Sequence, residues 1–314
     1  MTVQQKAFKS RRRYNQWVTN QTLEDFALRY TPVSARRWSA KRVVMTALSA
    51  ITFLALEAIG GALTLTYGFN YVVVAVILVS IIIFALSMPI AINAAKNGLD
   101  IDLLTRGAGF GYLGSTVTSL IYASFTFIFF ALEAAIMAMA LNMLFGLPLH
   151  FGYLIGSVVV IPLVTWGFTF ISRFQQFTQF CWLALQLLPF IFILIREHHV
   201  LQNWIDFPGF ITARDGSFDF LQLGAVCSVL LSLVSQVGEQ VDQVRFLPKP
   251  QHPARWRWYG AVIAAGPGWV VIGAIKILLG SFLAVLAFNY GLGAELASEP
   301  THMLSLIHIS EPTR

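Results

Sequence analysis

The segment Leu54-Ala-Leu-Glu57-Ala-Ile-Gly60-Gly61-Ala-Leu63 places a carboxylate and two glycines in the middle of a long apolar stretch. A second apolar stretch, Leu233-Val-Ser-Gln236-Val-Gly238-Glu239-Gln240-Val241, is interrupted in the same way. Irregular backbone at membrane depth is tolerated only where it lines a protein cavity, and matched interruptions in two halves of a chain point to a transporter-type site. We therefore expect both helices to unwind near these glycines, with Glu57 and Glu239 facing one another across one cavity.

The composition is that of an all-α polytopic membrane protein. Of 314 residues, 57% are hydrophobic and only 11% are charged, whereas soluble domains carry about 25% charged residues. Apolar runs of about 20 residues predict seven membrane spans. They cover residues 43–66, 71–95, 115–142, 152–171, 178–195, 221–241 and 260–289. The interrupted spans are the first and the sixth, and this spacing of five predicts a five-plus-five inverted repeat.

Charge along the chain predicts its orientation. Residues 1–42 hold ten Lys or Arg against Glu24 and Asp25, so the positive-inside rule places the amino terminus in the cytoplasm. The loop at 244–258 is expected on the same side and 196–220 outside. Within the amino-terminal segment we expect a short amphipathic helix over Leu23 to Tyr30. Because topology explains the net charge of +6, we expect a lipid bilayer rather than nucleic acid as the partner.

The last residues have a separate origin in our interpretation. Residues 304–314, Leu-Ser-Leu-Ile-His-Ile-Ser-Glu-Pro-Thr-Arg, resemble a translated sequencing-library adapter. We expect the natural chain to diverge from this sequence at about residue 304 and to continue into an eighth helix. The transmembrane domain, residues 43–303, is then incomplete and ends after about seven helices.

Four segments together resemble a known family. Ala95-Lys-Asn-Gly-Leu-Asp-Ile-Asp-Leu-Leu-Thr-Arg106-Gly-Ala-Gly-Phe-Gly111 is similar to a region of cytosine and purine permeases, members of the first nucleobase–cation symporter family. Gly60-Gly61, the segment Asp242-Gln-Val-Arg245-Phe246 and residues 273–291 resemble their first, sixth and seventh helices. The resemblance covers residues 43–303 in order. In it, Arg106, Asp242 and Arg245 belong to structural motifs.

The resemblance implies a LeuT-type fold and a function. Ten core helices, usually with two more, would enclose a substrate between helices one, three, six and eight. An aromatic on helix three would stack on a flat base, and the aligned residue here is Phe129, where the family more often has tryptophan. The implied function is binding or transport of a small planar nitrogenous, nucleobase-like solute by alternating access. Na⁺ or H⁺ would be the coupling ion, with no other cofactor.

A second resemblance keeps an alternative open. Residues 13–30 resemble the start of bacterial sensor histidine kinases whose membrane region is built like a permease. It implies a multi-pass protein of the bacterial cytoplasmic membrane that senses a ligand for covalently linked kinase domains. This chain holds no kinase core, so we do not expect it to be an enzyme itself. A structural membrane subunit is the third possibility.

Further ionisable residues lie near the expected cavity. Glu133 follows Phe129 by four residues and so shares its helical face, and Lys276 in span seven is a candidate counter-ion. Like charges in one cavity cannot all ionise cheaply, so we expect at least one carboxylate to be protonated at pH 7. The acids would bind an amine-rich ligand, form a proton relay in place of a sodium site, or lock the bundle as a structural charge network. The predicted substrate-binding residues are Glu57, Gly60, Phe129, Glu133, Gln236 and Glu239, and the predicted coupling residues are Glu57, Glu239 and Lys276.

The remaining motifs carry no chemistry in our interpretation. The G-x-G-x-x-G pattern at Gly109 to Gly114 lacks the preceding strand that a dinucleotide site needs, and we interpret it as a turn packed tightly against neighbouring helices. Arg173, Gln175, Gln176 and Gln179 are expected on a solvated cytoplasmic turn. We predict no catalytic residues and no metal site, since the sequence offers no activated nucleophile, phosphate loop or metal-ligand spacing.

Overall fold

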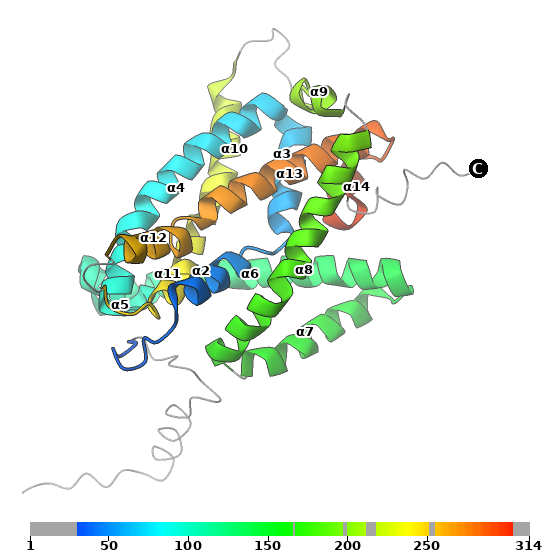
Figure 1. The fold of residues 1–314 in the computed structure, drawn as a ribbon. Helices are drawn as coiled ribbons and strands as arrows, with labels where there is room; N and C mark the ends of the chain where they lie inside the picture. Colours follow the sequence, from blue (N-terminus) through cyan, green and yellow to red (C-terminus); the bar gives the residue numbers. More distant parts are fainter. Residues whose placement is uncertain (1–29, 166, 197–199, 212–217, 251–254, 304–314) are drawn as a thin grey trace, which may run out of the picture.

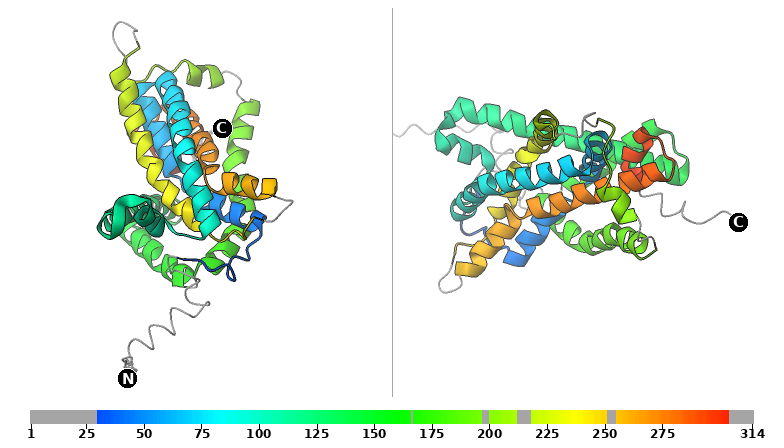
Figure 2. Two further views of the ribbon diagram at one scale, coloured as in Figure 1. Left: turned by 90° about the vertical axis from the view of Figure 1, so that its left-hand side faces the viewer. Right: turned by 90° about the horizontal axis from the view of Figure 1, so that it is seen from above.

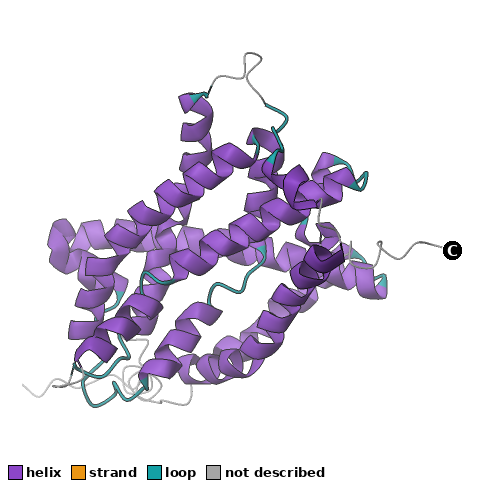
Figure 3. Cartoon of the chain, turned by 45° about the horizontal axis from the view of Figure 1, so that its top comes forward, coloured by secondary structure: helices purple, strands orange, loops and turns teal. Residues whose placement is uncertain are grey.

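The computed structural model describes residues 30–165, 167–196, 200–211, 218–250 and 255–303 (Figure 1). The described part of the chain is built from helices joined by short loops (Figure 3). In order they are α2 (Ala40–Ser49), α3 (Ala55–Tyr67), α4 (Phe69–Asn97), α5 (Ile101–Thr105), η1 (Arg106–Phe110), α6 (Gly111–Phe145), α7 (Leu149–Thr165), α8 (Gly167–Arg196), α9 (Val200–Ile205), α10 (Phe220–Leu231), η2 (Ser232–Ser235), α11 (Gln236–Val244), α12 (Arg255–Ala265), α13 (Trp269–Asn289) and α14 (Ala294–Ser298). The expected amphipathic helix at 23–30, the kinase-like segment at 13–30 and the adapter-like segment at 304–314 fall wholly or almost wholly outside the described residues.

Within the described residues, four helical segments are long and apolar enough to cross a membrane. They are Phe69–Asn97, Ile101–Phe145, Phe220–Val244 and Arg255–Asn289, and α7 with α8 forms a fifth span if this pair, bent by 119°, is counted as one. The bilayer core is about 30 Å thick and needs about 20 helical residues. The chain is therefore a helical multi-pass membrane protein. The spans predicted at 71–95 and 115–142 are confirmed as α4 and α6.

The first predicted span, 43–66, is broken, but not at its glycines. The chain leaves the helix after Ser49 and enters α3 at Ala55, and α3 runs without interruption through Gly60 and Gly61 (Figure 1). The expectation that these glycines unwind the helix is wrong. A Cβ at Gly60 would collide with the backbone carbonyl of Ile277, so this glycine permits close helix packing instead.

The sixth predicted span is irregular in a comparable way. A 3-10 turn at 232–235 separates α10 from α11, and tighter turns of this kind often mark functional hinges. Gly238 lies inside α11, where an added Cβ would lie 2.8 Å from the ring of Tyr122. The irregularity therefore precedes the glycine here as well, and the glycine makes room for an aromatic ring of α6.

One predicted boundary between spans is wrong. The chain turns at Gly167, whose φ is +77°, and not between residues 171 and 178, so α8 is a 30-residue helix that includes Gln175 and Gln179. The span predicted at 260–289 lies within the apolar segment Arg255–Asn289, where Gly266-Pro267-Gly268 interrupts the helix between α12 and α13, because proline cannot donate the hydrogen bond that a continuous helix needs.

The centre of the protein is the contact between α3 and α13. Gly280 of α13 lies against the backbone of Glu57, as Gly60 lies against Ile277. Small residues let two backbones approach closely, which strengthens packing where lipid offers no hydrophobic drive. Helices α4 and α10 lie side by side on one flank of this pair (Figure 2). The α3–α13 pair therefore fixes where polar side chains of these helices meet.

The segment before α2 closes one end of the bundle. Arg36 is buried and its guanidinium donates to the carbonyls of Ala95 and Lys96 at 3.2 and 3.0 Å. These carbonyls lie in the last turn of α4, where the helix leaves its acceptors unpaired. Trp38 stacks on Phe246 with ring centroids 4.5 Å apart. The segment thereby joins the end of α4 to the end of α11.

The glycine-rich segment after α5 turns the chain without being packed. Gly109 and Gly111 have φ of +111° and +65°, which favour glycine. In the part of the chain that the structure describes, no atom outside the segment lies within 4 Å of a Cβ built at Gly107, Gly109 or Gly111. The expected tight packing is therefore wrong, and backbone conformation is the reason for these glycines.

Candidate functional site

The break between α2 and α3 leaves backbone groups that other helices satisfy. The N–H of Ala55, at the start of α3, donates to Glu133 Oε1 of α6 at 2.9 Å. The carbonyl of Thr52 accepts from the indole Nε1 of Trp182 of α8 at 3.1 Å. The amino end of a helix carries partial positive charge, so a carboxylate is favourable there. Glu133 thus caps the half-helix α3 from a different helix.

A buried ion pair lies in the first turn of α3. Lys276 Nζ of α13 donates to Glu57 Oε1 at 2.5 Å, and Gln186 Nε2 of α8 donates to the same oxygen at 2.7 Å. The exposed fractions are 1% for Lys276, 3% for Glu57 and 7% for Gln186. Lys276 Nζ also lies 4.9 Å from the ring centroid of Trp182. Glu57 Oε2 has no hydrogen-bond partner among the described residues.

Aromatic rings from α6 cover the other side of the break. Phe53, in the unwound segment, meets Phe129 edge to face with centroids 5.2 Å apart. Phe125 lies 4.5 Å from Phe129 on the same helix. Phe129 therefore lies at the break, but its ring is already engaged by two other phenylalanines.

A cavity of about 450 Å³ opens beside the same break. It lies between the unwound residues, α7 and α8. Its polar lining consists of Ser49, Thr52, Gln175, Thr178, Gln179 and Trp182. Small-molecule sites typically have volumes of about 300–1,000 Å³ with a few convergent polar groups, so the cavity has the size of such a site.

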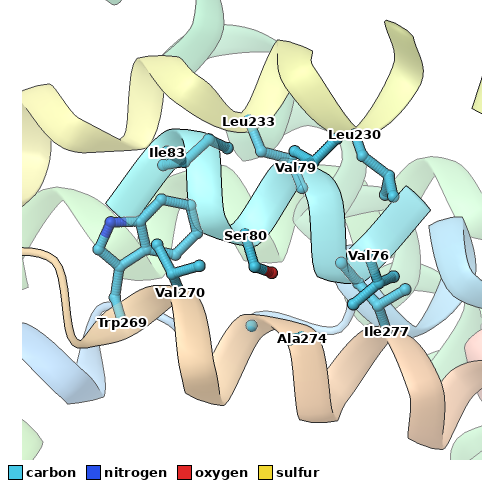
Figure 4. A pocket seen from close by; sticks show the side chains of 11 residues that line it. Val76, Val79, Ser80, Ile83, Leu230, Leu233, Trp269, Val270, Ala274 and Ile277 are labelled. Atoms are coloured by element: carbon cyan, nitrogen blue, oxygen red, sulfur yellow. The ribbon is translucent and has the colours of Figure 1, made fainter. Parts of the chain in front are cut away.

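A second void is too small for a solute. It lies between α4, the α10–η2 region and α13, with Ile83 and Trp269 at one end and the hydroxyl of Ser80 directed into it (Figure 4). Its volume is about 20 Å³, and a cavity needs about 10–15 Å³ to hold one water. We treat it as a packing void.

The irregular part of span six forms a separate polar cluster. Gln236 Nε2 donates to Glu239 Oε2 at 2.6 Å. The side chain of Gln240 is fully buried, and neither of its amide atoms has a partner in the described structure. Arg245 Nε lies 3.9 Å from Asp242 Oδ1, so these two motif residues interact within one helix.

The structure divides the predicted site residues into two groups. Glu57, Gly60, Phe129, Glu133 and Lys276 surround the α2–α3 break or the adjoining α3–α13 contact. The second group, Gln236 and Glu239, belongs to the η2–α11 cluster. No hydrogen bond links Glu57 to Glu239 in the described part of the chain, and each carboxylate has its own partner. Arg106 pairs with Asp102 at 2.9 Å, so this pair joins α5 to η1.

Sequence reasoning missed the contribution of α8. Gln175, Gln179, Trp182 and Gln186 follow one another at intervals of four, three and four residues, which places them on one helical face. Ser49 donates to Gln179 Oε1 at 2.7 Å, so this face contacts α2 directly. Polar residues at helical spacing within an apolar stretch could have indicated this face. Because a turn was predicted at 172–177, these residues were not recognised as belonging to one helix.

The described residues contain no group of three or more His, Cys, Asp or Glu arranged to hold a metal ion. In comparisons with known proteins, no family model, no curated protein and no solved structure matches this chain.

Proposed function

We propose that this chain is the membrane region of a permease-like protein that binds a small planar nitrogenous solute at the α2–α3 break and moves it by alternating access. The observation that carries the proposal is the unwound segment Ala50–Leu54 within an apolar span. Side chains from α6 and α8 hold its backbone, and a cavity of about 450 Å³ adjoins it. Unwound backbone at membrane depth is costly unless it lines a cavity.

The contacts on the two sides of the break support a hinge. Helix α2 packs on α8 and α12, whereas α3 packs on α13 and α14. Thr46 Oγ1 and Ser172 Oγ, 2.7 Å apart, tie α2 to α8, and Thr64 donates to Ser281 at 2.7 Å to tie α3 to α13. Short irregular segments between such bodies absorb the backbone changes of alternating access.

The contacts of Glu57 and Glu133 favour two of the three roles considered for the acids. Glu57 is paired with Lys276, and Glu133 caps α3, so both are engaged inside the protein and a cationic ligand would have to displace existing partners. A structural charge network or a proton path fits this geometry better. We propose H⁺ ahead of Na⁺ as the coupling ion, because the Lys276 ammonium already supplies a cation beside Glu57. The proposed location is the bacterial cytoplasmic membrane, with a cytoplasmic amino terminus.

Uptake into proteoliposomes tests the proposal. The purified protein is reconstituted, and accumulation of radiolabelled uracil, cytosine, adenine and hypoxanthine is compared with that in protein-free vesicles. We expect saturable uptake of at least one base, faster with an inward proton gradient. Saturable binding without flux would favour the ligand-sensing alternative. Neither binding nor uptake of any base would refute the proposed function.

A further inference from the structure

The cavity beside the break has a mainly apolar lining, and the polar groups in it are neutral. Hydroxyls come from Ser49, Thr52 and Thr178, and amides from Gln175 and Gln179, while Trp182 supplies an indole. Among the described lining residues there is no Asp, Glu, Lys, Arg or His. Lys276, whose ammonium lies 4.9 Å from the ring centroid of Trp182, is paired with Glu57. A charged solute would find no counter-charge in this lining, and burial of an unpaired charge is strongly unfavourable.

We propose that the α8 face bearing Gln175 and Gln179 is the element that reads the solute, and that it selects a neutral, flat molecule with an amide-like edge. This inference rests on the proposed function and deepens it. It moves recognition from the helix-three aromatic Phe129, whose ring is engaged by Phe53 and Phe125, to helix α8.

The hydrogen-bonding capacity of the two glutamines is complementary. Gln175 Oε1 is buried and has no hydrogen-bond partner in the described residues, so this face holds an unsatisfied acceptor, which a solute N–H would satisfy once the amide turns into the cavity. Gln179 Oε1 accepts from the Ser49 hydroxyl, which orients this amide and leaves its Nε2 to donate. The two residues are four apart on one helix and so neighbour each other. Together they offer one acceptor and one donor, the pattern that an N–H beside a C=O requires.

The indole of Trp182 is held in a fixed position. Its Nε1 donates to the Thr52 carbonyl, and the Lys276 ammonium lies 4.9 Å from the ring centroid. A ring that is already ordered loses little freedom when a flat ligand packs on it. Trp182 therefore supplies the aromatic wall and the two glutamines supply the polar edge.

Equilibrium binding of tritiated uracil to the purified protein tests the inference. Gln175→Leu removes the free acceptor, and we expect at least a tenfold loss of affinity, equal to about 1.4 kcal/mol. Thr178→Trp fills the cavity and should abolish measurable binding. Phe180→Trp is the matched control, because Phe180 is 69% exposed on the same helix, and it should bind like the wild type. Competition by 1,3-dimethyluracil, which lacks both N–H groups, should be at least tenfold weaker than competition by uracil.

The outcomes separate the two proposals. If the wild type binds uracil or another base and both cavity variants bind it equally well, the α8 inference is wrong and the proposed function stands. If the wild type binds none of the four bases used in the uptake assay, the proposed function fails and the inference falls with it. Size-exclusion chromatography shows whether each variant is folded. Should Thr178→Trp aggregate, Gln175→Leu and the methylated competitor still decide the question.

Discussion

Breaking the ion pair between Lys276 and Glu57 should destabilise the protein strongly. Both side chains are at most 3% exposed, and removal of one partner of a buried pair typically costs about 3–5 kcal/mol, because the other charge is left uncompensated. We expect losses of this size for Lys276→Met and for Glu57→Gln. In thermal unfolding this corresponds to a decrease on the order of 10 °C for a protein of this size.

The double variant gives the sharper result. Glu57→Gln with Lys276→Met removes both charges and leaves Gln186 a carbonyl acceptor, so most of the loss should be regained. Buried pairs can often be replaced by neutral groups at little cost. The assay is thermal unfolding of the detergent-solubilised protein, with exposed Lys41→Met as the matched control. A single variant within about 1 kcal/mol of wild type, or a double variant with simply additive losses, would refute the reasoning.

Three further predictions follow from packing, capping and topology. Gly280→Val should prevent proper folding, because a Cβ there collides with the backbone of α3, whereas Gly224→Val, in open space, should leave a monodisperse peak in fluorescence-detected size-exclusion chromatography. Glu133→Ala should lower the free energy of unfolding by about 1–2 kcal/mol, because it removes the hydrogen bond that caps Ala55. Glu133→Gln keeps an acceptor and should lower it less, as measured by thermal unfolding. Equal losses in the two variants would exclude capping as the cause. A cysteine at Lys249, in a background without the native cysteines, should resist an impermeant thiol reagent added to intact cells, and rapid labelling would reverse the proposed topology.

Hydropathy alone was enough to predict the long helices α4 and α6. Glu133 is the one charged residue within 71–95 and 115–142, so the length rule for membrane spans applies directly. The position of the breaks was not predictable in the same way. A glycine in an apolar span serves either for unwinding or for close packing, and only the presence of Ile277 against Gly60 distinguishes the two. For the same reason the irregular part of span six was predicted at Gly238, whereas the structure has it at residues 232–235.

The charged residues of the candidate site were predictable from the sequence, and its uncharged polar residues were not. Glu57, Glu133 and Lys276 stand out because ionisable residues in membrane spans are few, and the structure finds all three around one break. The sequence predicts Gln175 and Gln179 on a solvated turn, because uncharged amides are common in turns. The prediction is wrong because the turn between the fourth and fifth spans was placed too late in the sequence, and both residues lie inside α8. Glu57 and Glu239 have different hydrogen-bond partners. The partners of Glu57 come from distant helices, and the spacing of hydrophobic residues along the sequence does not indicate which helices pack together.

The central claim, that the α2–α3 break lines a solute site, is tested most directly by cysteine protection at Thr52. Thr52→Cys is made in a Cys181→Ser, Cys227→Ser background, and its rate of modification by a small thiol reagent is measured in membranes with and without saturating uracil or the best-bound base. Ile81→Cys on the exposed face of α4 serves as the reference for an effect unrelated to the site. We predict that the cysteine at position 52 reacts and is protected at least tenfold by the solute, while the cysteine at position 81 is unaffected. No reaction at position 52, or the same rate with and without a base that demonstrably binds, would contradict the claim.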